Sequence, residues 1–261
     1  MDGGPMIVLQ EVDLTLGERR VLKRVSFQVK SGETMVILGG SGSGKTTILR
    51  LMLGLYRPDQ GSVCIDGRDI SRLSERELPT VRRDMAMVFQ SAALFDSLSV
   101  RENVGYRLWE IGQLRDGAIN DIVQESLRFV GLHDIMEKMP AELSGGMRKR
   151  VGIARALASG AKILLYDEPT GGLDPINTCL INRLILRLKL KGVTQVVVTH
   201  DLDTADRVAD RIVMIDHGEI VFEGTPENLQ RSVHPVVRGF LNPHALTCGE
   251  DLFPRPIAQA E

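Results

Sequence analysis

A glycine-rich loop that ends in a lysine and a threonine is the strongest chemical feature of the sequence. It fits the pattern GxxxxGK followed by Ser or Thr, with an apolar run before it and a helical pattern after it. Its residues are Gly39, Gly40, Ser41, Gly42, Ser43, Gly44, Lys45 and Thr46, with Thr47 next. Such glycines let backbone N–H groups point inward at a helix N-terminus, which creates an anion site. We expect phosphate binding, with Lys45 on the phosphates and Thr46 on Mg²⁺; a chance match in a flexible turn is the alternative.

Two adjacent carboxylates, Asp167 and Glu168, end the apolar run Ile163–Tyr166. Ligands gather at the carboxyl ends of strands in a parallel sheet, so both acids are expected to face the phosphate loop. Asp167 suits support of Mg²⁺, whereas Glu168, which precedes Pro169, suits polarisation of an attacking water. Acidic pairs at strand ends are often only solvated, so the pair alone does not decide between these readings.

Three weaker candidates complete the set. Ser144 is a natural N-cap before Gly145 and Gly146, whose free N–H groups could bind another anion, although an ordinary capped helix would look the same. Gln90 and His200 each follow an apolar strand pattern. A lone histidine is more often structural than catalytic, so neither residue is informative by itself.

Strand and helix patterns alternate along most of the chain. Two alternating segments near the N-terminus, Ile7–Leu16 and Val21–Val29, predict antiparallel strands. Short apolar runs predict buried strands at Met35–Leu38, Met85–Phe89, Ile163–Tyr166, Val196–Thr199 and Ile212–Ile215. This order predicts an α/β fold with a mostly parallel sheet covered on both faces. Helical spacing between residues 91 and 159 predicts an inserted helical subdomain within a core of residues 1–90 and 160–230, followed by a tail of residues 231–261.

Composition excludes several classes of protein. The chain has 261 residues, 43% hydrophobic and 25% charged, with 32 Lys and Arg against 34 Asp and Glu, so nothing indicates nucleic-acid binding. No apolar run reaches the roughly 18 residues that span a bilayer, and no secretory signal pattern opens the chain. The three cysteines are far apart, which argues against disulfides and zinc. We expect a cytosolic protein that serves a membrane, if at all, through a partner.

The order of the motifs resembles that of the ATP-binding subunit of ABC transporters over residues 7–230. The phosphate loop, Gln90, LSGGM at residues 143–147, ILLYDEPT, GGLDP and His200 follow one another. The resemblance implies a P-loop (RecA-like) ABC ATPase fold that binds ATP and Mg²⁺ and couples hydrolysis to transport. It implies catalytic roles for Lys45, Gln90, Glu168 and His200, and a place for Gln90 beside Mg²⁺.

The same resemblance implies a second copy of the chain. In that family each ATP lies between one phosphate loop and the signature of the partner, in a head-to-tail dimer. The positions of this sequence that match the signature and the D-loop are Ser144, Gly145, Gly146 and Asp174. One copy of each motif therefore implies pairing with itself or with a homologue.

One position departs from the family pattern. An aromatic residue that stacks on adenine usually stands where this chain has Leu16. We expect weaker base stacking there, replaced by a guanidinium from Arg19 or Arg20. Selectivity for ATP over GTP is the property that this substitution puts in question.

Two segments resemble the ATPase of Mla-type lipid-asymmetry transporters. They are FQSAALFDSLSVRENV at residues 89–104 and VRGFL at residues 237–241. This resemblance implies phospholipid transport from the cytoplasmic face of the inner membrane. It implies a permease dimer, an MCE-type lipid-binding protein and a small STAS-domain subunit as partners. An importer of amino acids or other small solutes, and a signalling ABC ATPase that transports nothing, are the alternatives; a small-molecule kinase would have no use for LSGGM.

The segment His234–Leu241 carries four apolar side chains. Soluble monomers avoid exposing such a patch, so it must either fold back on its own domain or pack on a second protomer or partner subunit. The resemblance favours the intermolecular contact. Residues 242–261 contain few large apolar groups and are expected to stay extended until they bind.

Overall fold

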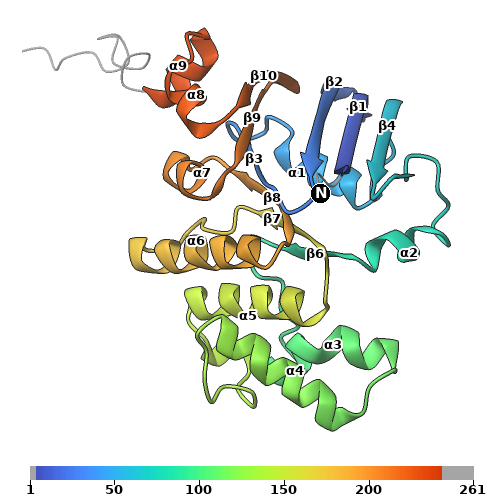
Figure 1. Cartoon of the computed structure of the whole chain (residues 1–261), viewed down its shortest axis with the longest axis vertical. Helices are drawn as coiled ribbons and strands as arrows, with labels where there is room; N and C mark the ends of the chain where they lie inside the picture. The colour runs from blue at the N-terminus through green and yellow to red at the C-terminus, as the bar shows by residue number, and fades with distance from the viewer. Residues whose placement is uncertain (1–3, 243–261) are drawn as a thin grey trace, which may run out of the picture.

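The computed structural model describes residues 4–242 and contains two β-sheets with helices around them (Figure 1). The four-stranded sheet has the order β2-β1-β4-β5, and the six-stranded sheet has the order β10-β9-β3-β8-β7-β6. The first sheet comprises β1 (Pro5–Leu16), β2 (Arg19–Lys30), β4 (Gln60–Ile65) and β5 (Arg68–Asp69). The second comprises β3 (Thr34–Leu38), β6 (Met85–Val88), β7 (Ile163–Asp167), β8 (Thr194–Thr199), β9 (Arg211–Asp216) and β10 (Glu219–Gly224).

Pairing within the sheets confirms the predicted fold class. β1 and β2 are antiparallel, as the alternating N-terminal pattern predicts. The strands β6, β7, β8, β3 and β9 are parallel neighbours, and only β10 runs against its neighbour in this sheet. Parallel strands place their carboxyl ends at one edge, so the loops that follow β3, β6, β7 and β8 gather there.

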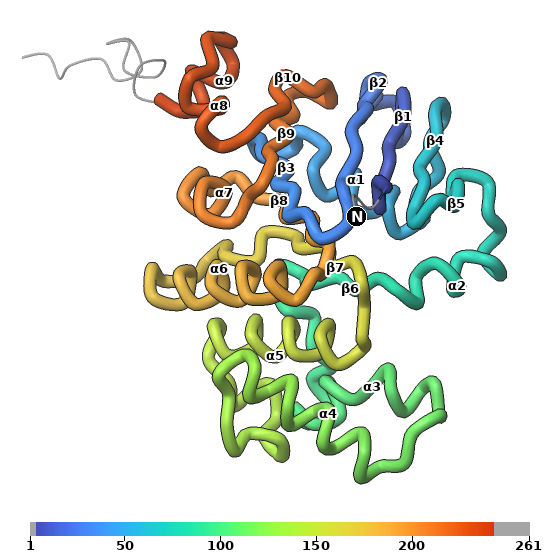
Figure 2. Tube along the Cα trace, viewed as in Figure 1, coloured from blue at the N-terminus to red at the C-terminus, as the bar shows by residue number. Residues whose placement is uncertain are grey.

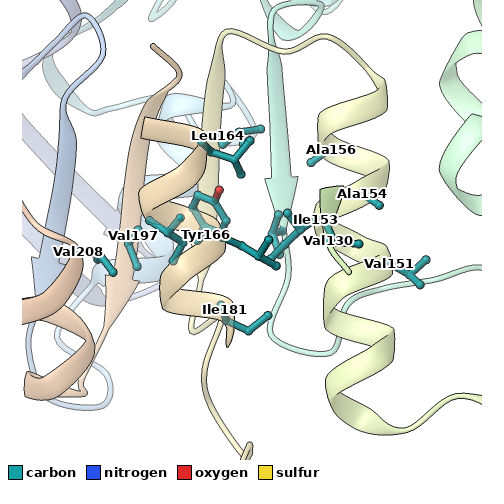
Figure 3. Close-up of a cluster of buried hydrophobic side chains, with 14 of the residues drawn as sticks. Val130, Val151, Ile153, Ala154, Ala156, Leu164, Tyr166, Ile181, Val197 and Val208 are labelled. Carbon is teal, nitrogen blue, oxygen red and sulfur yellow. The ribbon is translucent and has the colours of Figure 1, made fainter. Parts of the chain in front are cut away.

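The six-stranded sheet separates two apolar cores. Alternate side chains of β3 show this division, because Val36 and Leu38 belong to one cluster of buried residues and Met35 and Ile37 belong to the other. Figure 3 shows part of the first cluster, in which side chains from α5 (Gly145–Ala158) and α6 (Pro175–Leu190) gather around the buried Tyr166. Burial on both faces explains why these strands read as continuous apolar runs.

Three helices lie at the end of the molecule farthest from β1 and β2 (Figures 1 and 2). They are α3 (Val100–Ile111), α4 (Asp116–Phe129) and α5, and a short 3₁₀ helix (Pro140–Glu142) precedes α5. The predicted stripe of α4 is buried at Ile119, Val123 and Leu127. Ser99 caps α3 and Glu102 reaches back to the backbone of Ser99, so a capping box fixes where this helix begins.

The remaining helices are short and border the six-stranded sheet or its connections. They are α1 (Lys45–Met52), α2 (Leu78–Arg82), α7 (Leu202–Val208), α8 (Pro226–Gln230) and α9 (Pro235–Leu241). Among residues 4–242, no helix combines the length and the apolar character needed to cross a membrane.

The helix α9 folds back on its own chain. Val237 is fully buried in the same cluster as the helices of Figure 3, and Val236, Phe240 and Leu241 pack against that cluster. Helical spacing puts these side chains on one face, and the chain's own core covers part of that face, while Val236, Phe240 and Leu241 keep some exposed surface. The intermolecular contact that the sequence analysis favours for this segment stays a prediction. A partner contact made by residues 243–261 lies outside the described residues and stays a prediction.

Candidate active site

The phosphate loop connects β3 to α1 in a form that requires glycine at specific positions. Gly44 has φ of +112°, and a Cβ there would lie 2.8 Å from Cδ2 of Leu22 and 3.2 Å from the Val21 carbonyl oxygen. A Cβ on Gly39 would overlap with the carbonyl oxygen of Ile215. Neither position tolerates a side chain, because backbone from two other strands approaches too closely.

Lys45 is a buried cation at the start of α1. Its side chain is 7% exposed, and its Nζ donates hydrogen bonds to the carbonyl oxygens of Gly39 (2.9 Å) and Gly40 (2.8 Å). Burial lowers the pKa of Lys45, and the negative charges of Glu168 and Asp167 oppose this effect. The ammonium therefore lies between the loop that would hold phosphates and the carboxylates across from it.

Asp167 and Thr46 bring two hard oxygen atoms together. The Thr46 hydroxyl donates to Oδ1 of Asp167 at 2.9 Å. Burial raises the pKa of Asp167, while the hydrogen bond from Thr46 works in the opposite direction. A hydroxyl and a carboxylate oxygen fit the donor set that Mg²⁺ uses together with phosphate oxygens. Ser43 Oγ, in the same loop, is buried without a partner in the described part of the chain, and a phosphate oxygen could supply one.

Glu168 is oriented by the end of the neighbouring strand β8. Its Oε1 lies 2.9 Å from Nδ1 of His200, and its Oε2 accepts a hydrogen bond from the Thr199 hydroxyl at 3.3 Å. The side chain is 14% exposed, and Oε1 lies 3.9 Å from Nζ of Lys45. Glu168 has φ of +48°, a left-handed conformation that is costly outside glycine and is found at functional sites. The turn ends β7 and directs successive carboxylates to different partners.

A pocket of about 660 Å³ brings most of the predicted residues together. Its lining consists of Leu16, Arg19, Val21, Gly40, Ser41, Gly42, Gly44, Lys45, Thr46, Thr47, Gln90, Asp167, Glu168, His200 and Phe240. Gln90, which follows β6, lines the same pocket as Asp167 and Glu168. Arg19 lines the pocket and donates to the Gly42 carbonyl oxygen at 3.2 Å, whereas Arg20 is bound to Asp13 through Nε at 2.8 Å. Of the two arginines considered for the base, the structure brings only Arg19 to the pocket.

The signature residues and Asp174 do not line this pocket. Ser144 caps α5, because its Oγ accepts a hydrogen bond from the Met147 N–H at 3.3 Å. Asp174 caps α6 and accepts from the Asn177 N–H at 2.9 Å, a bond that lowers the pKa of Asp174. A Cβ on Gly146 would overlap with the amide of Asn177, so the two helix starts are in close contact. They form a second polar site, separate from the phosphate loop of the same chain.

Comparison with known proteins decides the family. The chain matches the ABC transporter family over residues 22–171. It belongs to that family. The cassette is therefore an ATP-binding ATPase subunit. Its phosphate loop and the two carboxylates at the end of β7 line one pocket.

Individual relatives agree on the family and differ in what their names say they transport. The cassette is 40% identical to the intermembrane phospholipid transport system ATP-binding protein MlaF of Escherichia coli over 238 residues, covering 91% of this chain and 88% of MlaF. It is 41% identical to the methionine import ATP-binding protein MetN of Carboxydothermus hydrogenoformans over 242 residues, covering 91% of this chain and 72% of MetN. The solved dimeric post-hydrolysis state of the cassette MJ0796, bound to ADP and Pi, is 36% identical and has a TM-score of 0.78, covering 85% of this chain and 99% of that chain.

The sequence analysis did not assign three residues that the structure places at or near these sites. Thr199 holds Glu168, and its place just before His200 at a strand end could have indicated it. Lys149 of α5 is buried and donates to the Gly171 carbonyl oxygen; burial lowers its pKa, against the charge of Glu168. Phe240 was noted only as part of an apolar tail, and no local signal places it near the phosphate loop.

Proposed function

We propose that this chain is the ATP-hydrolysing subunit that energises phospholipid transport across a bacterial envelope. ATP lies in the 660 Å³ pocket, with its β- and γ-phosphates at Lys45 and the backbone N–H groups of the loop. Thr46, Asp167 and Gln90 would hold Mg²⁺, which would offset the negative charge of the phosphates. The observation that most directly supports ATP hydrolysis is the position of the Glu168 carboxylate, which both Thr199 and His200 hold at the pocket.

Glu168 acts on the attacking water. Its carboxylate has two oxygens with separate neighbours, so Thr199 orients one while the other stays near the ammonium of Lys45 and the ring of His200. A water between this oxygen and the terminal phosphate would be polarised by Glu168 and aligned for in-line attack. His200 is largely exposed, so it can contact the terminal phosphate and hold the carboxylate in one orientation.

The second polar site serves another copy of the chain. Ser144, Gly145, Gly146 and Asp174 present two helix starts away from their own phosphate loop, where an anion from a partner would meet free N–H groups. The related MJ0796 cassette is dimeric in its solved state. These observations support a head-to-tail homodimer in which each ATP lies between Lys45 of one copy and Ser144 of the next.

An apolar groove next to the pocket is proposed as the contact with a permease. Its volume is about 510 Å³, and its apolar lining includes Met87, Phe89, Phe95 and Tyr106. The charged residues of its lining are Arg82, Arg107, Glu110 and Arg155. Phe95 and Tyr106 are each 45% exposed, with ring centroids 4.9 Å apart. Phe89, which lines the groove, directly precedes Gln90, which lines the nucleotide pocket. A membrane subunit seated in the groove would therefore touch the segment that reaches the nucleotide pocket.

The proposal that the substrate is a phospholipid depends on the segment of residues 89–104. Identity alone does not separate the alternatives, since MlaF and MetN are almost equally similar to the cassette. The segment 89–104, which carries the Mla-type resemblance, contributes Phe89, Ala93 and Phe95 to the groove, where a partner specific to the transport system would bind. An MCE-type protein and a STAS-domain subunit complete the proposed assembly, and the chain sits on the cytoplasmic face of the inner membrane through its permease. Within the chain we propose residues 91–159 as the helical subdomain and 1–90 with 160–230 as the core.

The substrate proposal predicts that the cassette, reconstituted with its permease, moves a fluorescent phospholipid between vesicles in an ATP-dependent way. ATP hydrolysis should rise with phospholipid and not with methionine or other amino acids. The comparison uses the same proteoliposomes, with radiolabelled methionine as the second cargo. Uptake of methionine without phospholipid transfer would favour the importer, and ATP hydrolysis with no movement of either cargo would favour a signalling role.

The groove proposal predicts that Phe95→Asp lowers co-purification with the permease at least about tenfold, because a carboxylate would be buried in an apolar contact. ATP binding by the isolated cassette should stay unchanged. Leu190→Asp is the matched control, since Leu190 is a largely exposed apolar residue at the end of α6, outside the groove. Equal losses for both variants, or none for Phe95→Asp, would contradict the assignment of the groove.

A further inference from the structure

Phe240 is the feature of the nucleotide pocket that the family motifs leave unexplained. It comes from the C-terminal helix α9, far in sequence from the phosphate loop, yet it lines the same pocket as Lys45. Within residues 4–242, it is the one Phe, Tyr or Trp side chain in that lining. The position near the first hairpin where an aromatic was expected carries Leu16 instead.

The place of Phe240 is set by the packing of α9. Val237 lies one turn earlier on the helix and is fully buried, and Phe240 itself packs against the same apolar cluster while part of its surface stays exposed. α9 lies near β10, which pairs with β9, and Ile215 of β9 is the residue that approaches Gly39 of the phosphate loop. The ring is therefore carried by an anchored helix rather than by a loose tail.

The lining of the pocket divides by chemistry. Charged and polar groups surround the loop and the carboxylates, where the phosphates and Mg²⁺ belong. Its apolar side chains are Leu16, Val21 and Phe240. A nucleobase is a flat π-system that gains from contact with apolar surface and above all with an aromatic ring, whereas a triphosphate gains nothing there.

We propose that Phe240 forms the aromatic contact for the base of the bound nucleotide, in place of the residue absent at position 16. Leu16 and Val21 supply the aliphatic part of the base site. Arg19, held by the Gly42 carbonyl oxygen, supplies a cation at the same pocket. The proposal rests on nucleotide binding at this pocket, and it makes base recognition depend on the C-terminal helix.

The first experiment separates base from phosphate contacts. Binding of ATP and of inorganic tripolyphosphate is measured by calorimetry for the wild type, for Phe240→Ala and for Leu241→Ala. Leu241 is the matched control, because it packs against the same cluster from the same helix without lining the pocket. Phe240→Ala should weaken ATP at least about fivefold, in the range found for loss of a base stack, and leave tripolyphosphate unchanged.

Three results would overturn the proposal. These are unchanged ATP affinity in Phe240→Ala, equal weakening of ATP and tripolyphosphate, or an equal loss of ATP affinity in Leu241→Ala. Wild-type protein that failed to bind tripolyphosphate would instead contradict the phosphate site, so the two failures are distinguishable.

A fluorescence experiment tests the contact without removing the ring. The chain has one tryptophan, Trp109, which lies in α3. In a Trp109→Phe background, Phe240→Trp places a single reporter at the proposed contact. ATP should quench its emission by stacking, and tripolyphosphate should not. No response to ATP, or the same response to both ligands, would show that the base lies elsewhere.

Discussion

Glu168→Gln is expected to lower ATP hydrolysis by about 10²- to 10⁴-fold, the usual contribution of a general base, while ATP binding survives. Glutamine keeps the size of the side chain and its hydrogen bond from Thr199, but it removes the charge that polarises water. The positive backbone φ of residue 168 remains equally strained in both proteins, so the comparison isolates the carboxylate. Because binding is retained and cleavage is not, ATP-bound dimers should accumulate.

The measurement is steady-state release of phosphate, with ATP affinity and size-exclusion chromatography on the same preparations. Glu125→Gln is the matched control, since Glu125 is an exposed residue of α4 away from the pocket. It should hydrolyse ATP like the wild type. Wild-type turnover in Glu168→Gln would remove Glu168 from the mechanism, and a loss of ATP affinity would show that the change damages the phosphate site instead.

Local patterns were sufficient to predict the phosphate loop and the strands around it. A strand buried on both faces of a parallel sheet must be apolar throughout, so β3, β7 and β8 could be predicted from continuous apolar runs. Few structures other than a phosphate loop fit a glycine-rich stretch with Lys45 and Thr46 directly after such a run. The neighbours Asp167 and Glu168 were also visible from their place at a strand end. Their different partners were not, because the left-handed turn at Glu168 cannot be read from residue type.

Strand alternation could have narrowed the choice between Arg19 and Arg20 as the residue at the base site. Adjacent residues of a strand point to opposite faces, so only one of the two could face the pocket. Arg20 lies on the face where β1 presents Asp13, and the ion pair holds it there. The sequence contains no indication of which face is which until β1 and β2 are paired.

Contacts between segments far apart in the chain could not be predicted from the sequence. The burial of Val237 and the position of Phe240 depend on how α9 folds back onto the sheet, and an apolar helical stripe predicts only that something covers it. The close approach of Gly146 to Asn177 is of the same kind. These two cases concern the surfaces that we propose for the ligand and for the second copy, and local patterns carry least information there.

The second large effect is expected from two inactive variants that restore each other. Lys45→Ala removes the buried cation at the phosphates, so nucleotide affinity should fall about tenfold or more. Ser144→Arg should bind ATP normally as a monomer, because Ser144 does not line the pocket of its own chain. It should lose hydrolysis, because the arginine side chain would occupy the space where Ser144 meets the phosphates bound by the partner. Ser144→Ala is the control for loss of the helix cap without added bulk, at about 1 kcal/mol of stability.

A mixed dimer has one site with both substitutions and one with neither, provided that each ATP lies between Lys45 of one copy and Ser144 of the other. Equal mixing should therefore recover about one quarter of the wild-type sites, because half of the dimers are mixed and each contains one intact site of two. Lys45→Ala mixed with the double variant Lys45→Ala/Ser144→Arg has no intact site and should stay inactive. If one competent site suffices for turnover, a mixture of the single variants without activity would mean that each chain uses its own signature. The separation of Ser144 from the phosphate loop within one chain argues for the opposite result, since no residue of that helix start reaches the described pocket.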